Sequence, residues 1–270
     1  MLGRILSAEP VRDPRVVGGP GGGGAGAGGE YLVAKTDPIT HTTEEIGWFA
    51  VHINATDIAC LGATPAWFLA VLLLPEDSAS EASAERIFAD IRRGCADIGV
   101  SLVGGHTEIT FGLPRPMVAG AMLGEVGRER LVTPKGAKAG DALVLTKGVP
   151  LEAVAILARE RRDDLVRAFG EERVEAASRL LYEPGISVVP AVRTAVSAGV
   201  VHAMHDPTEG GITTALVELA TASGLGLEVY PDRIPVLEET HAVCDCLDLD
   251  PLGLIASGAA DPQLRAALER

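Results

Sequence analysis

Three carboxylates stand where predicted strands and helices meet turns, and their chemistry suits a magnesium ion and phosphate groups. Asp37 follows a strand-like segment, Asp57 lies near the end of a helix-like segment, and Glu108 follows the pair Gly104-Gly105. Mg²⁺ prefers oxygen ligands and is usually held by one or two carboxylates together with substrate phosphates. Taken singly, each acid also fits a turn former or a local cap. Together they predict a metal and phosphate site.

The elements that must position these acids alternate between strands and helices in the first half of the chain. A helix is expected from a threonine cap at 42–43 to about residue 60, and Asn54 lies one turn before Asp57 on the same helix face. Apolar residues recur there at helical spacing. The other expected elements are strands at 30–35, 67–74, 101–103 and 117–125 and a helix at 83–99.

A polar stretch containing proline and glycine at 131–141 predicts a domain boundary, with domains at 1–130 and 131–270. The second half again mixes the two kinds of element. We expect strands at 142–146, 200–204 and 225–230 and helices at 151–161, 188–198, 212–223 and 260–270. This pattern predicts an α+β protein whose sheets are covered on one face.

The composition limits the classes of function. The chain has 270 residues, of which 47% are hydrophobic, and its formal net charge is −14. A general nucleic-acid binder needs basic patches, so we do not expect this class of protein. A nucleotide bound through Mg²⁺ stays possible, because the metal ion supplies the positive charge. No apolar run is long enough to span a membrane, and the first residues do not resemble a signal peptide. We therefore expect a cytoplasmic protein with no membrane partner.

Cysteine usage agrees with a reducing compartment. The four cysteines follow no secretory signal, so reduced thiols are expected. His241, Cys244 and Cys246 resemble a metal cluster only superficially, because their spacing matches no common zinc pattern.

The segment 16–29, VVGGPGGGGAGAGG, is dominated by glycine. Glycines can expose backbone N–H groups to a phosphate, but the segment lacks the Lys-Ser/Thr ending of a P-loop and the spacing of a dinucleotide fingerprint. A flexible linker is the favoured interpretation.

Four motifs in order carry a family resemblance: TDPIT, NATDIACLGATP, GGHTE and HDPTEGG. Together they resemble the AIR synthase-related proteins of the PurM-like ATP-binding superfamily, and the most similar branch is that of the hydrogenase maturation proteins HypE. The resemblance covers about residues 15–260. It implies a two-domain PurM-like fold, in which an N-terminal mixed sheet forms a barrel across a homodimer and is followed by a C-terminal α/β two-layer domain. It also implies ATP and Mg²⁺ as cofactors and a small molecule as substrate.

The resemblance also assigns site residues in the first domain. It implies that Asp37 and Asp57 bind Mg²⁺ and phosphate, and that Gly104, Gly105 and Thr107 belong to a loop that approaches the phosphates. Asn54 would face the same site. Glu108 is the better magnesium ligand because it is the harder donor, while His106 would contact a phosphate or transfer a proton.

In the second domain, the HDPTEGG motif precedes a predicted helix. His205 and Asp206 are candidates for proton transfer or substrate contact, and Glu209, Gly210 and Gly211 for binding at the helix N-terminus, where anions are stabilised. An Asp or Thr N-cap followed by a glycine turn is the structural alternative.

Three functions follow from these patterns. The first is an ATP-dependent enzyme that phosphorylates, and so activates, the oxygen of a small carbonyl or amide substrate. The second is a catalytically degenerate nucleotide-binding scaffold or maturation factor. It is favoured because the glycine-rich segment lacks the aspartate found in relatives and because the chain ends RAALER without the C-terminal cysteine of HypE. The third is a small-molecule kinase of the thiamine-phosphate type.

Overall fold

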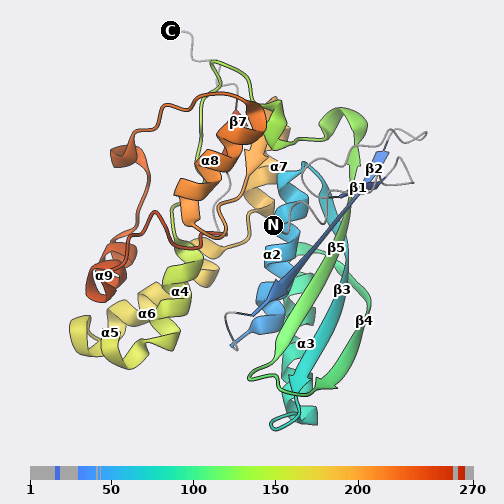
Figure 1. The fold of residues 1–270 in the computed structure, drawn as a ribbon, viewed down its shortest axis with the longest axis vertical. Coiled ribbons are helices and arrows are strands. Elements are labelled where there is room, and N and C mark those ends of the chain that lie inside the picture. Colours follow the sequence, from blue (N-terminus) through green and yellow to red (C-terminus); the bar gives the residue numbers. More distant parts are fainter. Residues whose placement is uncertain (1–15, 19–29, 41, 43, 258–260, 265–270) are drawn as a thin grey trace. The chain divides into compact units, whose positions relative to one another are not determined.

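The chain divides into two compact units, residues 1–131 and 132–270. The computed structural model describes residues 16–18, 30–40, 42, 44–257 and 261–264 (Figure 1). Most of the glycine-rich segment, interpreted above as a flexible linker, therefore lies outside the described residues at 19–29, as does the end of the expected C-terminal helix.

Unit 1 is built on a mixed five-stranded sheet with the order β1-β2-β5-β3-β4. The strands are β1 (Val16–Gly18), β2 (Glu30–Ile39), β3 (Thr64–Pro75), β4 (Ser101–Thr110) and β5 (Met117–Gly127). Strand β5 is antiparallel to both β2 and β3, whereas β4 runs parallel to β3 and β1 parallel to β2. The expectation of a mixed sheet is confirmed.

Two helices, α2 (Ile46–Cys60) and α3 (Glu81–Ile98), cover one face of this sheet (Figure 1). Helix α2 is buried on nearly all sides because apolar residues occupy most of its positions. Helix α3 is amphipathic and begins with a capping box in which Ser80 and Ser83 exchange hydrogen bonds. The aliphatic core of unit 1 therefore lies between α2 and the sheet.

Several boundaries in unit 1 differ from those expected. Strand β2 continues to Ile39, because Asp37 and Pro38 pair with β5 instead of turning. Strand β4 continues through Gly104-Gly105 to Thr110, because β3 pairs with it over that length. The prediction of a threonine cap for α2 is wrong. The helix begins at Ile46, and its N-cap position is Glu45 in a left-handed conformation (φ 52°).

Unit 2 is mainly helical. Its elements are η2 (Pro134–Gly136), α4 (Leu151–Glu160), α5 (Arg162–Phe169), α6 (Glu171–Arg179), η3 (Leu181–Gly185), α7 (Val189–Ala198), β6 (Val201–His205), α8 (Gly211–Ser223), η4 (Pro231–Arg233), α9 (Glu238–Leu247) and β7 (Asp261–Leu264). Helices α4, α5, α6 and α9 pack together (Figure 1), while β6 and β7 form a two-stranded antiparallel sheet.

The expected two-layer arrangement of the second domain is wrong in part. The segments 142–146 and 225–230 carry the alternating apolar residues of strands, but neither forms one among the described residues. A strand needs a hydrogen-bonded neighbour, and here neither segment has one over its length. Residues 261–264, expected to be helical, instead pair with β6 as β7.

A search of the described residues for a helix long and apolar enough to cross a membrane finds none.

Gly120 of β5 provides a test of the packing between α2 and the sheet. A Cβ atom there would collide with Asn54 Nδ2 and lie 2.7 Å from Phe68 Cε2. We expect Gly120→Ala to lower the free energy of unfolding by about 1–3 kcal/mol, as overpacking of a core does. Gly127→Ala on the same strand is the control, because a Cβ atom at Gly127 meets nothing within 4 Å. Urea denaturation measures both variants, and equal stability of the two would contradict this packing.

Candidate functional site

Asn54 joins helix α2 to strand β2 by hydrogen bonds at Asp37. Its Nδ2 donates to the carbonyl oxygens of Asp37 (3.1 Å) and Ala50 (2.8 Å), and its Oδ1 accepts from the N–H of Asp37 at 2.9 Å. The side chain is 0% exposed, so it has no surface to offer a ligand. The expectation that Asn54 contacts the nucleotide is therefore corrected: it positions the backbone of Asp37.

Lys35, Asp37 and Asp57 interrupt the apolar contact between β2 and α2. Alternate residues of β2 face the helix, and Lys35 and Asp37 stand between the buried Val33 and Ile39. Lys35 Nζ lies 3.1 Å from Asp57 Oδ1, and their side chains are 28% and 18% exposed. Charged groups at this depth are costly unless they are paired or bind a ligand. The three residues therefore form one polar site, which we call the β2–α2 site.

Glu108 and His106 lie elsewhere in unit 1. A row of paired residues runs straight across the sheet from Asp37 through Gly120 and Ala70 to Gly105. Three strand spacings separate the two ends of this row, which amounts to about 14 Å. Glu108 on β4 thus cannot share an ion with Asp37 of the same chain, and the expected three-carboxylate magnesium site is corrected on this point.

The residues of β4 are nevertheless open to ligands. The side chains of His106 and Glu108 are 67% and 61% exposed, and His106 Nε2 lies 3.7 Å from Glu108 Oε2. Gly104 and Thr107 are also exposed. At Gly105, where φ is 155°, a Cβ atom would collide with the carbonyl oxygen of Ala70. This glycine is therefore required for close pairing with β3, whatever it binds.

In unit 2, His205 ends β6 and is held by two carboxylates. Its Nε2 lies 2.8 Å from Glu218 Oε2, and its Nδ1 lies 3.8 Å from Asp206 Oδ1. Burial lowers the pKa of His205, but hydrogen bonds and attraction from Asp206 and Glu218 outweigh burial, so the pKa is raised. The pair His205–Asp206 is thus brought together as expected, and the imidazole is poised to exchange a proton.

The glycines after His205 serve the start of α8. Gly210 is the N-cap position in a left-handed conformation, and Gly211 packs so closely on the carbonyl oxygens of Leu252 and Leu254 that no Cβ atom fits. No side chain caps this helix, so the structural alternative of an Asp or Thr N-cap is wrong. Glu209 is exposed beside it. Two N–H groups of the first turn of α8 already have partners, because Gly211 donates to the carbonyl oxygen of Thr208 at 3.0 Å and Thr213 donates to that of Leu252 at 3.3 Å.

Two residues of these sites, Lys35 and Glu218, were not predicted from the sequence, and neither was the buried Lys147, which lies outside both sites. Lys35 is signalled only by its place two residues before Asp37, which puts both on one face of a strand. Nothing in the sequence around Glu218 indicates a role in the site, because Glu218 reaches His205 only through the position of helix α8. Lys147 donates to the carbonyl oxygens of Gly185 (2.6 Å) and Ser187 (2.7 Å), and burial lowers its pKa to about 8.

The β2–α2 site has side chains suited to a magnesium ion with a phosphate, since Asp57 pairs with Lys35 and Asp37 lies two residues farther along the same face of β2. In the part of the chain that the structure describes, no group of three or more His, Cys, Asp or Glu side chains is placed to hold a metal. A metal there must take further ligands from a substrate or water, which is the usual habit of Mg²⁺. The described residues include no such group at His241, Cys244 and Cys246 either.

The interaction of His205 with Glu218 predicts a pH dependence of stability. Because the pKa of His205 is raised above its ordinary value of 6.5, the pair stabilises the fold below about pH 6.5 and ceases to do so as the pH rises through the folded-state pKa. We expect Glu218→Gln to cost up to about 1 kcal/mol at pH 5.5 and much less at pH 9, since Glu218 is exposed. Glu172→Gln, at an exposed position of α6, is the control. Urea denaturation at both pH values checks this, and a cost that did not change with pH would contradict it.

Comparison with known proteins gives a consistent family. The N-terminal domain model of the AIR synthase related proteins matches residues 22–126, and the C-terminal domain model matches residues 138–260. Carbamoyl dehydratase HypE of Cupriavidus necator is 30% identical over 240 residues, which are 85% of this chain and 64% of that protein. The chain thus spans less than two thirds of the length of this relative.

Two solved structures share the fold. A structure described as hydrogenase maturation protein HypE in complex with ATP has a TM-score of 0.68 and 25% identity, covering 87% of this chain and 70% of the other. AaThiL complexed with AMPPCP and TMP has a TM-score of 0.75 and 21% identity, covering 97% and 82%. The two domain models in the expected order, together with the mixed α/β fold and its sheet, lead to one conclusion: this chain belongs to the AIR synthase related protein family.

Proposed function

We propose that this chain is an ATP-dependent enzyme that uses Mg²⁺ to phosphorylate, and so activate, the oxygen of a small carbonyl or amide substrate. The observation that carries the proposal is the β2–α2 site, where Lys35, Asp37 and Asp57 interrupt an otherwise apolar interface. Support comes from the carbamoyl dehydratase of C. necator and from the HypE structure with ATP. The proposal names the substrate only by its chemical class, a small carbonyl or amide compound.

Each residue has a stated task in this proposal. Asp37 and Asp57 hold the metal ion, which would supply positive charge to the phosphate oxygens. Lys35 changes partner from Asp57 to a phosphate when the ion binds. His106, Thr107 and Glu108 of β4, with Gly104-Gly105, contact phosphates or substrate at a second place in unit 1.

Unit 2 would supply the group that exchanges protons. His205 and Asp206 act on the substrate, and the first turn of α8, with Glu209, Gly210 and Gly211, binds its anionic part. A proton on His205 is stabilised by Asp206 and Glu218, so the residue can serve as an acid near neutral pH.

Two alternatives stay open because particular observations favour them. The fold shared with AaThiL favours a small-molecule kinase. The glycine-rich sequence at 18–29, which contains no acidic residue, favours a nucleotide-binding scaffold without turnover. Release of phosphate or ADP from ATP separates an enzyme from a scaffold, and a phosphorylated product identifies a kinase.

We further propose that two copies associate through the uncovered face and edge of the sheet in unit 1. Helices α2 and α3 cover only one face, and β4 is an edge strand. Apolar side chains are exposed there, namely Val71 (38%), Val103 (54%), Ile109 (63%) and Phe111 (87%). An exposed strand edge beside an apolar patch is a surface that proteins normally cover.

Replacement of Asp57 tests the metal site. In calorimetric titrations of ATP with Mg²⁺, we expect Asp57→Ala to weaken binding by about tenfold or more, because a charged ligand to the ion is lost. Asp77→Ala, at an exposed turn of unit 1, should bind as the parent protein does. Full affinity in Asp57→Ala, or binding that ignores Mg²⁺, would disprove the assignment.

A charge on the β4 surface tests association. We expect Ile109→Asp to convert a dimer into a monomer, because a carboxylate would be buried without a partner in the interface. Val200→Asp, at a valine that is 66% exposed in unit 2, is the control and should leave the dimer intact. Light scattering after size-exclusion chromatography measures the mass. A parent protein that is monomeric at all concentrations would refute the proposal.

A further inference from the structure

Unit 2 contains a cavity of about 920 Å³ that takes no part in the proposed reaction. Its walls are residues 138–145, 225–230 and 233–235, together with Ile212 and Leu216 of α8. None of the residues proposed above to bind Mg-ATP or substrate lines it. A volume of this size lies in the range of sites for small molecules, which is about 300–1,000 Å³.

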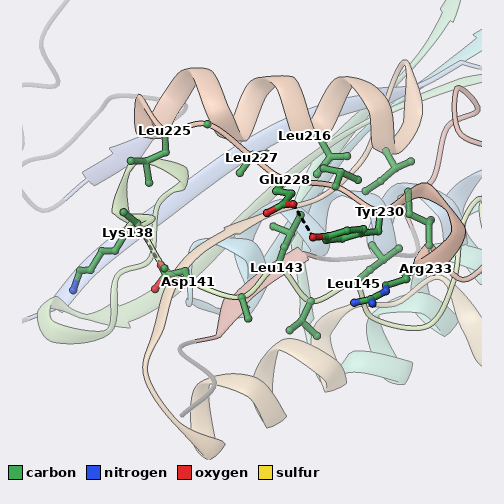
Figure 2. A pocket seen from close by; sticks show the side chains of 18 of the residues that line it. Lys138, Asp141, Leu143, Leu145, Leu216, Leu225, Leu227, Glu228, Tyr230 and Arg233 are labelled. Carbon is green, nitrogen blue, oxygen red and sulfur yellow. Dashed lines mark hydrogen bonds between the residues drawn. The ribbon is translucent and has the colours of Figure 1, made fainter. Parts of the chain in front are cut away.

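Much of the cavity wall is aliphatic, although the hydrogen-bonded pair Glu228 and Tyr230 lies among the leucines (Figure 2). Leucine side chains from three separate segments line it, and Figure 2 shows them between Lys138 and Arg233: Leu143, Leu145, Leu216, Leu225 and Leu227. Below them lies a small core made of Val149, Ile212 and Ala256. A chain of methylene groups is the ligand that such a wall stabilises, at roughly 0.8 kcal/mol for each buried CH₂ group.

The carboxylates around the cavity are already engaged. Asp141 Oδ1 lies 2.9 Å from His202 Nδ1 and its Oδ2 accepts from the N–H of Lys138, while Glu228 accepts from the hydroxyl group of Tyr230 at 2.7 Å. Neither carboxylate forms an ion pair with Lys138 or Arg233 among the described residues.

The two basic side chains of the wall contact a histidine and a tyrosine, and Lys138 is also attracted by the Asp141 carboxylate. Lys138 Nζ lies 3.2 Å from His202 Nε2, which accepts the hydrogen bond because an ammonium group only donates. The guanidinium carbon of Arg233 lies 4.8 Å from the ring centroid of Tyr230. Lys138 and Arg233 stand at opposite ends of the leucines in Figure 2. The Arg233 end of the cavity therefore offers a positive charge, whereas the Lys138 ammonium group points away from the leucines (Figure 2).

We propose that this cavity is a second ligand site, which binds a free linear aliphatic carboxylate. The alkyl chain lies against the leucines, and the carboxylate pairs with Arg233 at one end. Arg233 is better suited to a bidentate pair because its guanidinium is planar and is already oriented by the Tyr230 ring. The site is independent of Mg²⁺ and ATP.

The test is a calorimetric titration of octanoate into the full chain without nucleotide, below the concentration at which octanoate forms micelles. We expect saturable binding with one site per chain, and binding of octan-1-ol at least about tenfold weaker, because a charge-assisted hydrogen bond is lost. This comparison uses the parent protein, so it does not depend on the folding of any variant. No saturable binding of octanoate, or equal affinity for the alcohol, would overturn the proposal.

Substitutions then locate the carboxylate. We expect Arg233→Gln to weaken octanoate binding by about tenfold and Lys138→Gln to do so to a smaller extent. Arg193→Gln, on the exposed surface of α7, is the matched control and should have no effect. Unchanged affinity in the double variant Lys138→Gln/Arg233→Gln, with an unchanged melting temperature, would also overturn the proposal. Mg-ATP affinity should be the same in all of these variants, so this result is separate from that of Asp57→Ala.

Discussion

The hydrogen bonds between Asn54 and the main chain of Asp37 are the constraint on which unit 1 depends. A fully buried amide joins the central helix to a strand by one accepted and one donated bond, and it also donates to the helix carbonyl of Ala50. Buried polar groups in such an arrangement permit only one register, because any slip would leave several of them unpaired. The same contact leaves no room for a Cβ atom at position 120. The register of β2 against α2 then places Lys35 beside Asp57 and Asp37 beside Asn54.

Much of unit 1 follows from local sequence, because its elements carry strong periodic signals. The end of α2 and nearly all of α3 were predicted from apolar spacing, capping residues and glycine. The failures have one cause: pairing between strands overrides local preference. Asp37-Pro38 and Gly104-Gly105 are typical of turns, yet β5 and β3 draw them into strands. The opposite error occurs in unit 2, where strands were predicted at 142–146 and 225–230 and none formed. These segments have the sequence pattern of strands but no neighbouring strand to pair with.

The candidate sites were predictable to a similar degree. The motifs identify Asp37, Asp57, His205 and Asp206, and the structure keeps each pair within one unit. Sequence spacing alone could not separate Glu108 from Asp37, because strand order is a non-local property. Nor could it reveal that Asn54 is buried or that Glu218 reaches His205. In each case, the deciding fact is a contact between residues that are distant along the chain.

The ion pair between Lys35 and Asp57 has a consequence for how the protein exists before any ligand arrives. A cluster of acids alone would repel itself, and folding would then depend on a cation from solution. Here Lys35 is a counter-ion that the chain itself supplies, so Asp57 is paired in the folded state without a cation from solution. In the metal site that we propose, an incoming ion must compete with this tethered ammonium group, which lowers the affinity of the site for the ion.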